Sequence, residues 1–200
     1  MGTINSAIAL VKNPVGYITQ NKDSPATVMG IMVNYVAVLA AIPFIATLIG
    51  DLWYYSYFAL FGFVGSYVAY AFLSAFLTYI LDVIAVYVVA LVIGFLASNF
   101  GSTTTPIKNL KLSAYIFTPA FLIGVLNIIP FLGIVEILGI LYGLYILYLG
   151  LPIMLNTPKD KVVTYVIGVV VATIVVYAII GVIIGLITAA IFVASFGYFF

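Results

Sequence analysis

Long apolar stretches separated by short polar segments make up most of this chain. A helix needs about 20 apolar residues to cross the hydrocarbon core of a bilayer. Measured against that length, the apolar stretches predict an all-α protein, a polytopic bundle of transmembrane helices. The third and fourth helices are expected to meet near Pro130. The five predicted spans are residues 27–50, 74–98, 112–129, 132–155 and 162–187.

The positions of the lysines determine how many crossings we predict, because lysine and arginine are retained on the cytoplasmic side of a membrane. The chain has no arginine, and its lysines fall into three polar segments: Lys12 and Lys22, Lys108 and Lys111, Lys159 and Lys161. Two spans within residues 52–99 would place Lys108 and Lys111 on the opposite side of the membrane from Lys12 and Lys22. One span places every lysine on the same side. The pattern therefore predicts a cytoplasmic N-terminus and an outer C-terminus.

Residues 52–73 differ from the other apolar stretches because they are dense in tryptophan, tyrosine and phenylalanine. Such rings are enriched at the level of the lipid headgroups. We therefore predict an extra aromatic helix on the outer side, either interfacial or re-entrant, before the second span. That residues 52–73 themselves span the membrane is the alternative at this point.

The first 26 residues are too polar to cross the membrane and are predicted to form a cytoplasmic, interfacial segment ahead of a transmembrane domain over residues 27–200. Pro14 interrupts the helical spacing of apolar residues in this segment, which favours two short helices on the inner leaflet. A partly disordered tail is the alternative. The apolar residues at helical spacing are Ile4, Ile8, Val11, Val15 and Ile18.

Composition excludes several classes of function. Hydrophobic residues make up 66% of the chain and charged residues 6%, with a mean hydropathy of +1.38, whereas a soluble domain has about a quarter of its residues charged. A net charge of +1 provides no field that would attract nucleic acid. Because the chain has neither cysteine nor histidine, the usual metal ligands and catalytic bases are missing. We expect no enzyme activity, no cofactor, no metal centre and no nucleic-acid partner.

The region from residue 113 to residue 161 carries a family resemblance. It contains Ala114-Tyr115 followed by Pro119, then Ile129-Pro130 and Leu132-Gly133, and then an aromatic helix that begins at Tyr142-Gly143 and leads into Lys159-Asp160-Lys161. This succession resembles the Yip1-domain family of five-span membrane proteins, and in particular its short archaeal or bacterial members. The resemblance implies a multi-pass protein of the cell membrane with a cytosolic N-terminus. Eukaryotic members are associated with vesicle trafficking and prenylated Rab-type GTPases.

Three polar residues within the predicted spans are candidates for a site. Asp82 and Glu136 are carboxylates inside membrane helices, where a charge costs roughly 2.5–3.5 kcal/mol and suggests a function. At about 1.5 Å per residue, both acids and Asn127 come to similar depths near the outer end of the bundle. The acids must be protonated, hydrogen-bonded or bound to a cation. Both a structural pair and a site for a proton or a hard cation fit this pattern.

Two pairs of glycines at a spacing of four residues are candidates for close helix contacts, because small residues let membrane helices approach each other. Gly139 and Gly143 lie in the fourth predicted span, and Gly181 and Gly185 lie in the fifth. We expect them to pack within the chain. Oligomerisation through one of the pairs is the alternative.

The resulting functional hypothesis is a Yip1-like, multi-pass membrane protein that acts without catalysis as a membrane-organising or partner-binding scaffold. The expected partners are membrane lipids and either a membrane protein or a second copy of the chain. One alternative is a small cation or proton transporter or channel that uses Asp82 and Glu136. Another is an accessory subunit of a larger membrane complex.

Overall fold

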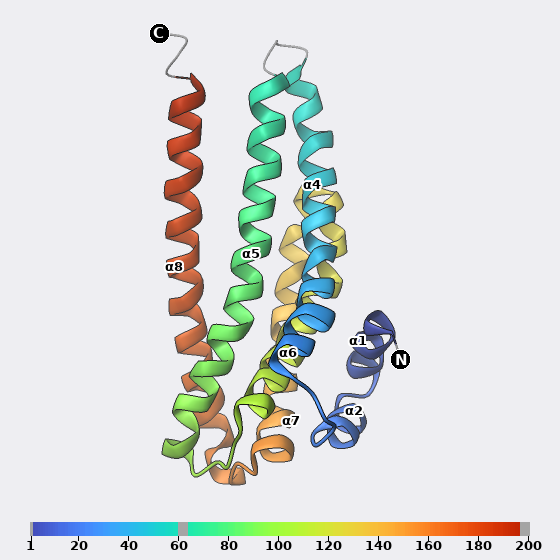
Figure 1. Cartoon of the computed structure of the whole chain (residues 1–200), viewed down its shortest axis with the longest axis vertical. Helices are drawn as coiled ribbons and strands as arrows, with labels where there is room; N and C mark the ends of the chain where they lie inside the picture. Colours follow the sequence, from blue (N-terminus) through green and yellow to red (C-terminus); the bar gives the residue numbers. More distant parts are fainter. Residues whose placement is uncertain (1, 60–63, 197–200) are drawn as a thin grey trace.

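The computed structural model describes residues 2–59 and 64–196, and within these ranges the chain forms helices and no strand (Figure 1). Five of the described segments are long and apolar enough to cross a membrane. The predicted all-helical architecture with five candidate spans is therefore confirmed. The segments are Val28–Tyr54, Ala71–Phe100, Pro106–Ile128, Phe131–Leu155 and Lys159–Ala190.

The first two spans are longer than the sequence suggested. The helical segments α3 (Val28–Ile31), η1 (Met32–Ala37, a π-helical turn) and α4 (Val38–Ala59) follow one another without a break, and α5 (Val64–Ala97) returns alongside them (Figure 1). Within the aromatic stretch, residues 52–59 thus continue α4 and residues 64–73 begin α5. Residues 60–63 lie outside the described ranges.

A separate interfacial or re-entrant helix is therefore not found in the described part of residues 52–73. The physical reason is backbone hydrogen bonding. Backbone amides and carbonyls in a membrane must be paired, and continuing a helix pairs them within the segment. No proline interrupts α4 after Pro43, so nothing forces the chain to leave the helix where the aromatic residues begin.

The third and fourth spans form a shorter hairpin. The helix α6 (Pro106–Ile123) continues as η3 (Gly124–Ile128), and after η4 (Pro130–Val135) the chain returns as α7 (Glu136–Leu155). The turn between them lies against Gly50 of α4, where an added Cβ would stand 2.9 Å from the carbonyl oxygen of Ile128. Because α4 continues beyond Gly50, the α6–α7 turn lies below the described end of α4 (Figure 1).

The most buried of the candidate spans is α6, which contacts α1, α3, α4, α5 and α7. It also has the lowest mean hydropathy of the five, as expected for a helix surrounded by protein rather than lipid. Its buried hydroxyls are satisfied by backbone carbonyls: Ser113 Oγ donates to Val86 O at 2.6 Å, and Thr118 Oγ1 donates to Ala114 O at 2.8 Å.

The N-terminal segment forms two helices, α1 (Thr3–Lys12) and α2 (Pro14–Asn21), with the break that Pro14 predicts. Both pack on the bundle and bury apolar residues against it. Thr3 Oγ1 donates to Asn34 O of the π-helical turn, and Tyr142 OH of α7 donates to Val11 O, each at 2.7 Å. The segment is therefore helical and docked. Its location on the cytoplasmic face stays a prediction.

The segments that carry Lys22, Lys108 and Lys159 meet at one end of the bundle (Figure 1). Lys108 Nζ lies 2.8 Å from Asp23 Oδ1, which joins the α2–α3 loop to the start of α6. The end of α7 is joined to the α5–α6 connection, because Thr103 N donates to Leu155 O at 2.8 Å. This clustering agrees with lysines on a single side, and the side of the membrane that this end faces stays a prediction.

The last helix, α8 (Val162–Phe196), follows the 3₁₀ turn η5 (Lys159–Lys161) and lies along α5 (Figure 1). Its first half is anchored in the core: Tyr165 is fully buried, and its hydroxyl donates to Ile93 O of α5. The Tyr165 ring also stacks on Phe100 at a centroid distance of 4.6 Å. The second half of α8 is much less covered, as described below.

Candidate functional site

The α6–α7 turn brings two of the predicted polar residues into direct contact. Asn127 lies in η3, and Glu136 is the first residue of α7. Asn127 Nδ2 donates to Glu136 Oε1 at 2.7 Å. The contact follows from the short 3₁₀ segments on both sides of Ile129-Pro130, since proline begins η4 and turns the chain back within a few residues.

Asp82 faces the same region from α5. It forms a hydrogen bond with Tyr177 of α8 and lies within electrostatic range of Glu136. The structure thus places Asp82, Glu136 and Asn127 in one polar cluster between α5, α8 and the α6–α7 turn, together with Tyr177. Tyr177 was not predicted from the sequence. The sequence feature that could have indicated it is its position within an apolar span, away from the span ends where interfacial tyrosines are expected.

The chemistry of this polar cluster is limited to oxygen and amide groups. Among the described residues, no group of three or more His, Cys, Asp or Glu side chains is arranged to hold a metal ion. Asn127 Oδ1 is buried and accepts no hydrogen bond from the described part of the chain. The arrangement supports a hydrogen-bonded network, and it also supports the binding of a proton by one of the two carboxylates.

The glycines of α7 face α6 at very short range. A Cβ added to Gly139 would stand 2.7 Å from Ala120 Cα, and one added to Gly143 would overlap the carbonyl oxygen of Ile116. A Cβ added to Gly150 would instead meet the end of the Leu112 side chain, which can move aside more easily than backbone. Because no side chain larger than hydrogen fits at Gly139 and Gly143, these two positions allow the backbones of α6 and α7 to touch.

The glycines of α8 have the opposite surroundings. An added Cβ at Gly181 or Gly185 would meet nothing within 4 Å. No described residue of α8 beyond Ile180 is buried, and Val182 and Leu186 are 62% and 68% exposed. This face of α8 therefore packs on no described part of the chain.

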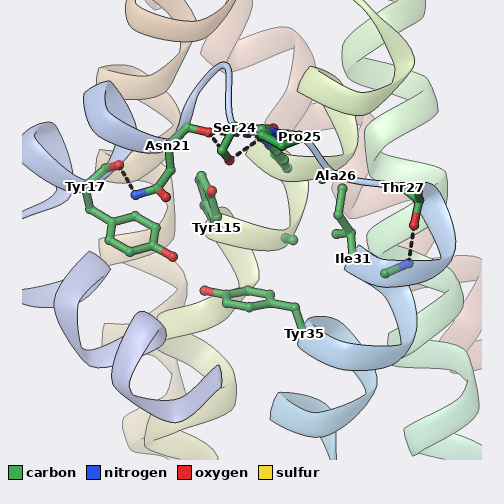
Figure 2. A pocket seen from close by; sticks show the side chains of 12 residues that line it. Tyr17, Asn21, Ser24, Pro25, Ala26, Thr27, Ile31, Tyr35 and Tyr115 are labelled. Carbon is green, nitrogen blue, oxygen red and sulfur yellow. Dashed lines mark hydrogen bonds between the residues drawn. The ribbon is translucent and has the colours of Figure 1, made fainter. Parts of the chain in front are cut away.

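A cavity of about 610 Å³ opens at the lysine-bearing end, between α2, the α2–α3 loop and α6 (Figure 2). One wall holds Lys111, whose Nζ donates to Asn21 O at 3.0 Å and to Ser24 O and Ser24 Oγ at 2.5 and 2.9 Å. The tyrosines in the lining come from three different helices. The lining residues are Tyr17, Asn21, Ser24, Pro25, Ala26, Thr27, Gly30, Ile31, Tyr35, Lys111, Ala114 and Tyr115.

Sequence reasoning did not predict this cavity. The available signal was Lys111, a lysine placed five residues inside a helix that begins at Pro106. Its neighbour Lys108 forms the exposed ion pair with Asp23, and that hydrogen bond holds the pKa of the Asp23 carboxyl below its usual value. The two lysines therefore have different partners, a carboxylate for Lys108 and neutral oxygens for Lys111.

The comparisons with known proteins give one match. The model of the Yip1 domain family matches residues 8–180 of the chain. The matched range runs from α1 into α8 and includes the polar cluster and the cavity, whereas the open glycines Gly181 and Gly185 lie just beyond it. No curated protein and no solved structure matches the chain significantly.

Proposed function

The chain belongs to the Yip1 domain family and is a multi-pass membrane protein, and from this premise we propose that it acts without catalysis, as a scaffold that binds a partner within the membrane. The lack of cysteine and histidine supports a role that depends on contacts rather than on a reaction. The cell membrane is the proposed location.

The observation that carries this proposal is the open face of α8. Small residues mark the places where membrane helices approach each other closely, and Gly139 and Gly143 illustrate this within the chain. Gly181 and Gly185 have the same spacing, yet nothing within 4 Å occupies their face. A transmembrane helix of a partner protein or of a second copy would fill this face.

We expect the double variant Gly181→Leu/Gly185→Leu to lose a lateral partner of α8. The wild-type protein would be extracted from native membranes in lipid nanodiscs, and proteins that co-purify in fixed stoichiometry would be quantified by mass spectrometry. Loss of close helix contact should reduce the recovered partner about tenfold, which corresponds to roughly 1.4 kcal/mol.

The matched control is Ala190→Leu, which makes a similar change at an exposed position about half a turn around α8 from Gly181. This variant should retain the partner. Equal recovery from the double variant and the wild type would refute a partner at the glycine face. A partner that is one of several subunits in a fixed assembly would identify the chain as an accessory subunit.

A second candidate function is supported by the polar cluster. Asp82, Glu136, Asn127 and Tyr177 come from separate segments and meet inside the bundle. Intramembrane carboxylates that face a bundle interior mark proton and ion pathways in many membrane proteins. A small proton or cation transporter is therefore the alternative to the scaffold.

The variant Asp82→Asn separates these two functions. Under the scaffold proposal, we expect the protein in liposomes to produce no proton flux, measured with an enclosed pH-sensitive dye, either as wild type or as Asp82→Asn. The asparagine can still accept a hydrogen bond from Tyr177, so its melting temperature should remain close to wild type. Asp82→Leu cannot accept that bond and should lose about 1–2 kcal/mol of stability. A wild-type flux that Asp82→Asn abolishes would establish transport instead.

A further inference from the structure

The cavity at the lysine-bearing end has the size and position of a ligand site. Its volume of about 610 Å³ falls within the range of roughly 300–1,000 Å³ that is usual for small-molecule pockets. It lies where α2 and the α2–α3 loop cover the start of α6, just before Val28 begins the first span (Figure 2). A ligand in it would therefore sit at the boundary between the membrane and water.

The electrostatics of the cavity favour an anion. Lys111 is only 4% exposed, and its ammonium group is held by three oxygen atoms of Asn21 and Ser24, none of which is a carboxylate. The carboxylate of Asp23 is hydrogen-bonded to Lys108. No acid contacts Lys111 directly, but the Asp23 carboxylate lies within electrostatic range of both Lys108 and Lys111. These two lysines and one carboxylate leave a net charge of +1 beside the cavity, which favours an anion.

Tyr115 supplies a hydroxyl group to the lining of the cavity. Its side chain is 6% exposed and lines the cavity, and its hydroxyl makes no hydrogen bond to any described residue. In the described part of the chain Asn127 Oδ1 is the buried side-chain atom without a partner, so the Tyr115 hydroxyl is not sealed in the core but can be reached from the cavity. The ring is fixed from two sides, by Tyr17 at a centroid distance of 5.6 Å and by Tyr35 at 6.1 Å. An oriented, unpaired donor therefore faces the cavity.

The neighbouring tyrosines complete the lining. Tyr17 also contributes a hydroxyl without a hydrogen bond to the described part of the chain, whereas the hydroxyl of Tyr35 is paired with Thr118 Oγ1 at 2.9 Å. Tyr35 lies in the π-helical turn η1, a distortion that is frequent at functional sites. The lining thus combines hydroxyl donors, a fixed positive charge and apolar ring faces.

We propose that this cavity binds a phosphate-bearing anion, with the phosphate held by the hydroxyls of Tyr115 and Tyr17 near the ammonium group of Lys111. Phosphate oxygens accept strong hydrogen bonds from such donors, and a cation strengthens them. The phosphate can come from the headgroup of an anionic phospholipid or from a free phosphate anion. The site does not involve α8 and is independent of the partner proposed for that helix.

The test uses the full-length protein in detergent and counts bound molecules by native mass spectrometry. The probes are dioleoylphosphatidylglycerol, dioleoylphosphatidylcholine and inorganic phosphate. We expect one saturable site with a preference for an anionic probe, and we expect Tyr115→Phe to weaken binding about tenfold, because it removes one hydroxyl donor and keeps the ring. Tyr17→Phe is the second variant, for the case that Tyr115→Phe fails to fold.

The matched control is Tyr148→Phe, which removes a hydroxyl from an exposed tyrosine of α7 outside the cavity and should bind as wild type does. Saturable phosphatidylglycerol binding that inorganic phosphate does not replace would identify a lipid headgroup. Saturation by inorganic phosphate alone, weakened in Tyr115→Phe, would identify a free anion. Equal binding of the two lipids, or unchanged affinity in both tyrosine variants, would overturn the proposal.

Discussion

Replacing Gly143 by leucine is expected to destabilise the fold more than the same change at any open glycine, by about 2–3 kcal/mol. An added Cβ at this position would overlap the carbonyl oxygen of Ile116, which belongs to the backbone of α6. A backbone atom cannot rotate away as a flexible side chain can. The helices α6 and α7 would have to separate, and α6 is the most buried span of the bundle. The gain in helix propensity from glycine to leucine, about 1 kcal/mol, does not offset this cost.

Thermal unfolding of the purified protein in detergent measures this effect. For a chain of 200 residues, a loss of this size lowers the melting temperature by roughly 5–10 °C. Gly181→Leu is the matched control, because the same side chain enters open space at that position. It should leave the stability unchanged or raise it by up to about 1 kcal/mol, because the side chain meets no neighbour and leucine is the better helix former. Equal melting temperatures for the two variants would mean that α6 and α7 do not touch at Gly143.

The number and order of the spans could be predicted from the sequence because both depend on local quantities. The length of each apolar stretch limits how often the chain crosses, and the positions of the lysines favour a single crossing within residues 52–99. The helix break at Pro14 is equally local, since proline lacks the amide that a continuing helix needs. These features require no knowledge of which helices touch.

The ends of the helices were harder to predict, and residues 52–73 show why. Aromatic residues are favoured at the membrane interface whether they lie on a separate interfacial helix or at the end of a long spanning helix. In α4 no proline follows Pro43, so nothing ends the helix where the aromatic residues begin. Aromatic density alone does not distinguish the two arrangements.

The candidate sites likewise include features that could be predicted from the sequence and features that could not. Counting residues along each helix placed Asp82, Glu136 and Asn127 at similar depths, and the structure places them in one cluster with Tyr177. Similar depth does not tell which helices are neighbours, so Tyr177 could not be selected from the sequence. The cavity beside Lys111 depends on the docking of α2 on α6, and no spacing in the sequence reports that contact.

Lys111→Met is expected to release the N-terminal helices, because Lys111 ties the loop after α2 to α6. Its ammonium group donates to two backbone carbonyls and one hydroxyl of residues 21 and 24. Methionine has a similar length and apolar stem but no donor, so those oxygens would lose their buried partner. Hydrogen bonds to charged groups contribute about 1.5–3 kcal/mol each and are not additive. We expect the local free energy of opening to fall by about 2–3 kcal/mol.

Hydrogen exchange of the backbone amides of α1 and α2, measured by mass spectrometry in nanodiscs, reports this opening. Exchange should accelerate roughly 30- to 150-fold in Lys111→Met. Lys108→Met is the matched control: it removes an ion pair with Asp23, whose side chain is 64% exposed, and such surface pairs contribute less than about 1 kcal/mol. If both variants exchanged equally fast, the buried contacts of Lys111 would not be what holds α1 and α2 on the bundle. A large effect of Lys111→Met alone would show that one buried lysine both closes the cavity wall and holds the N-terminal helices in place.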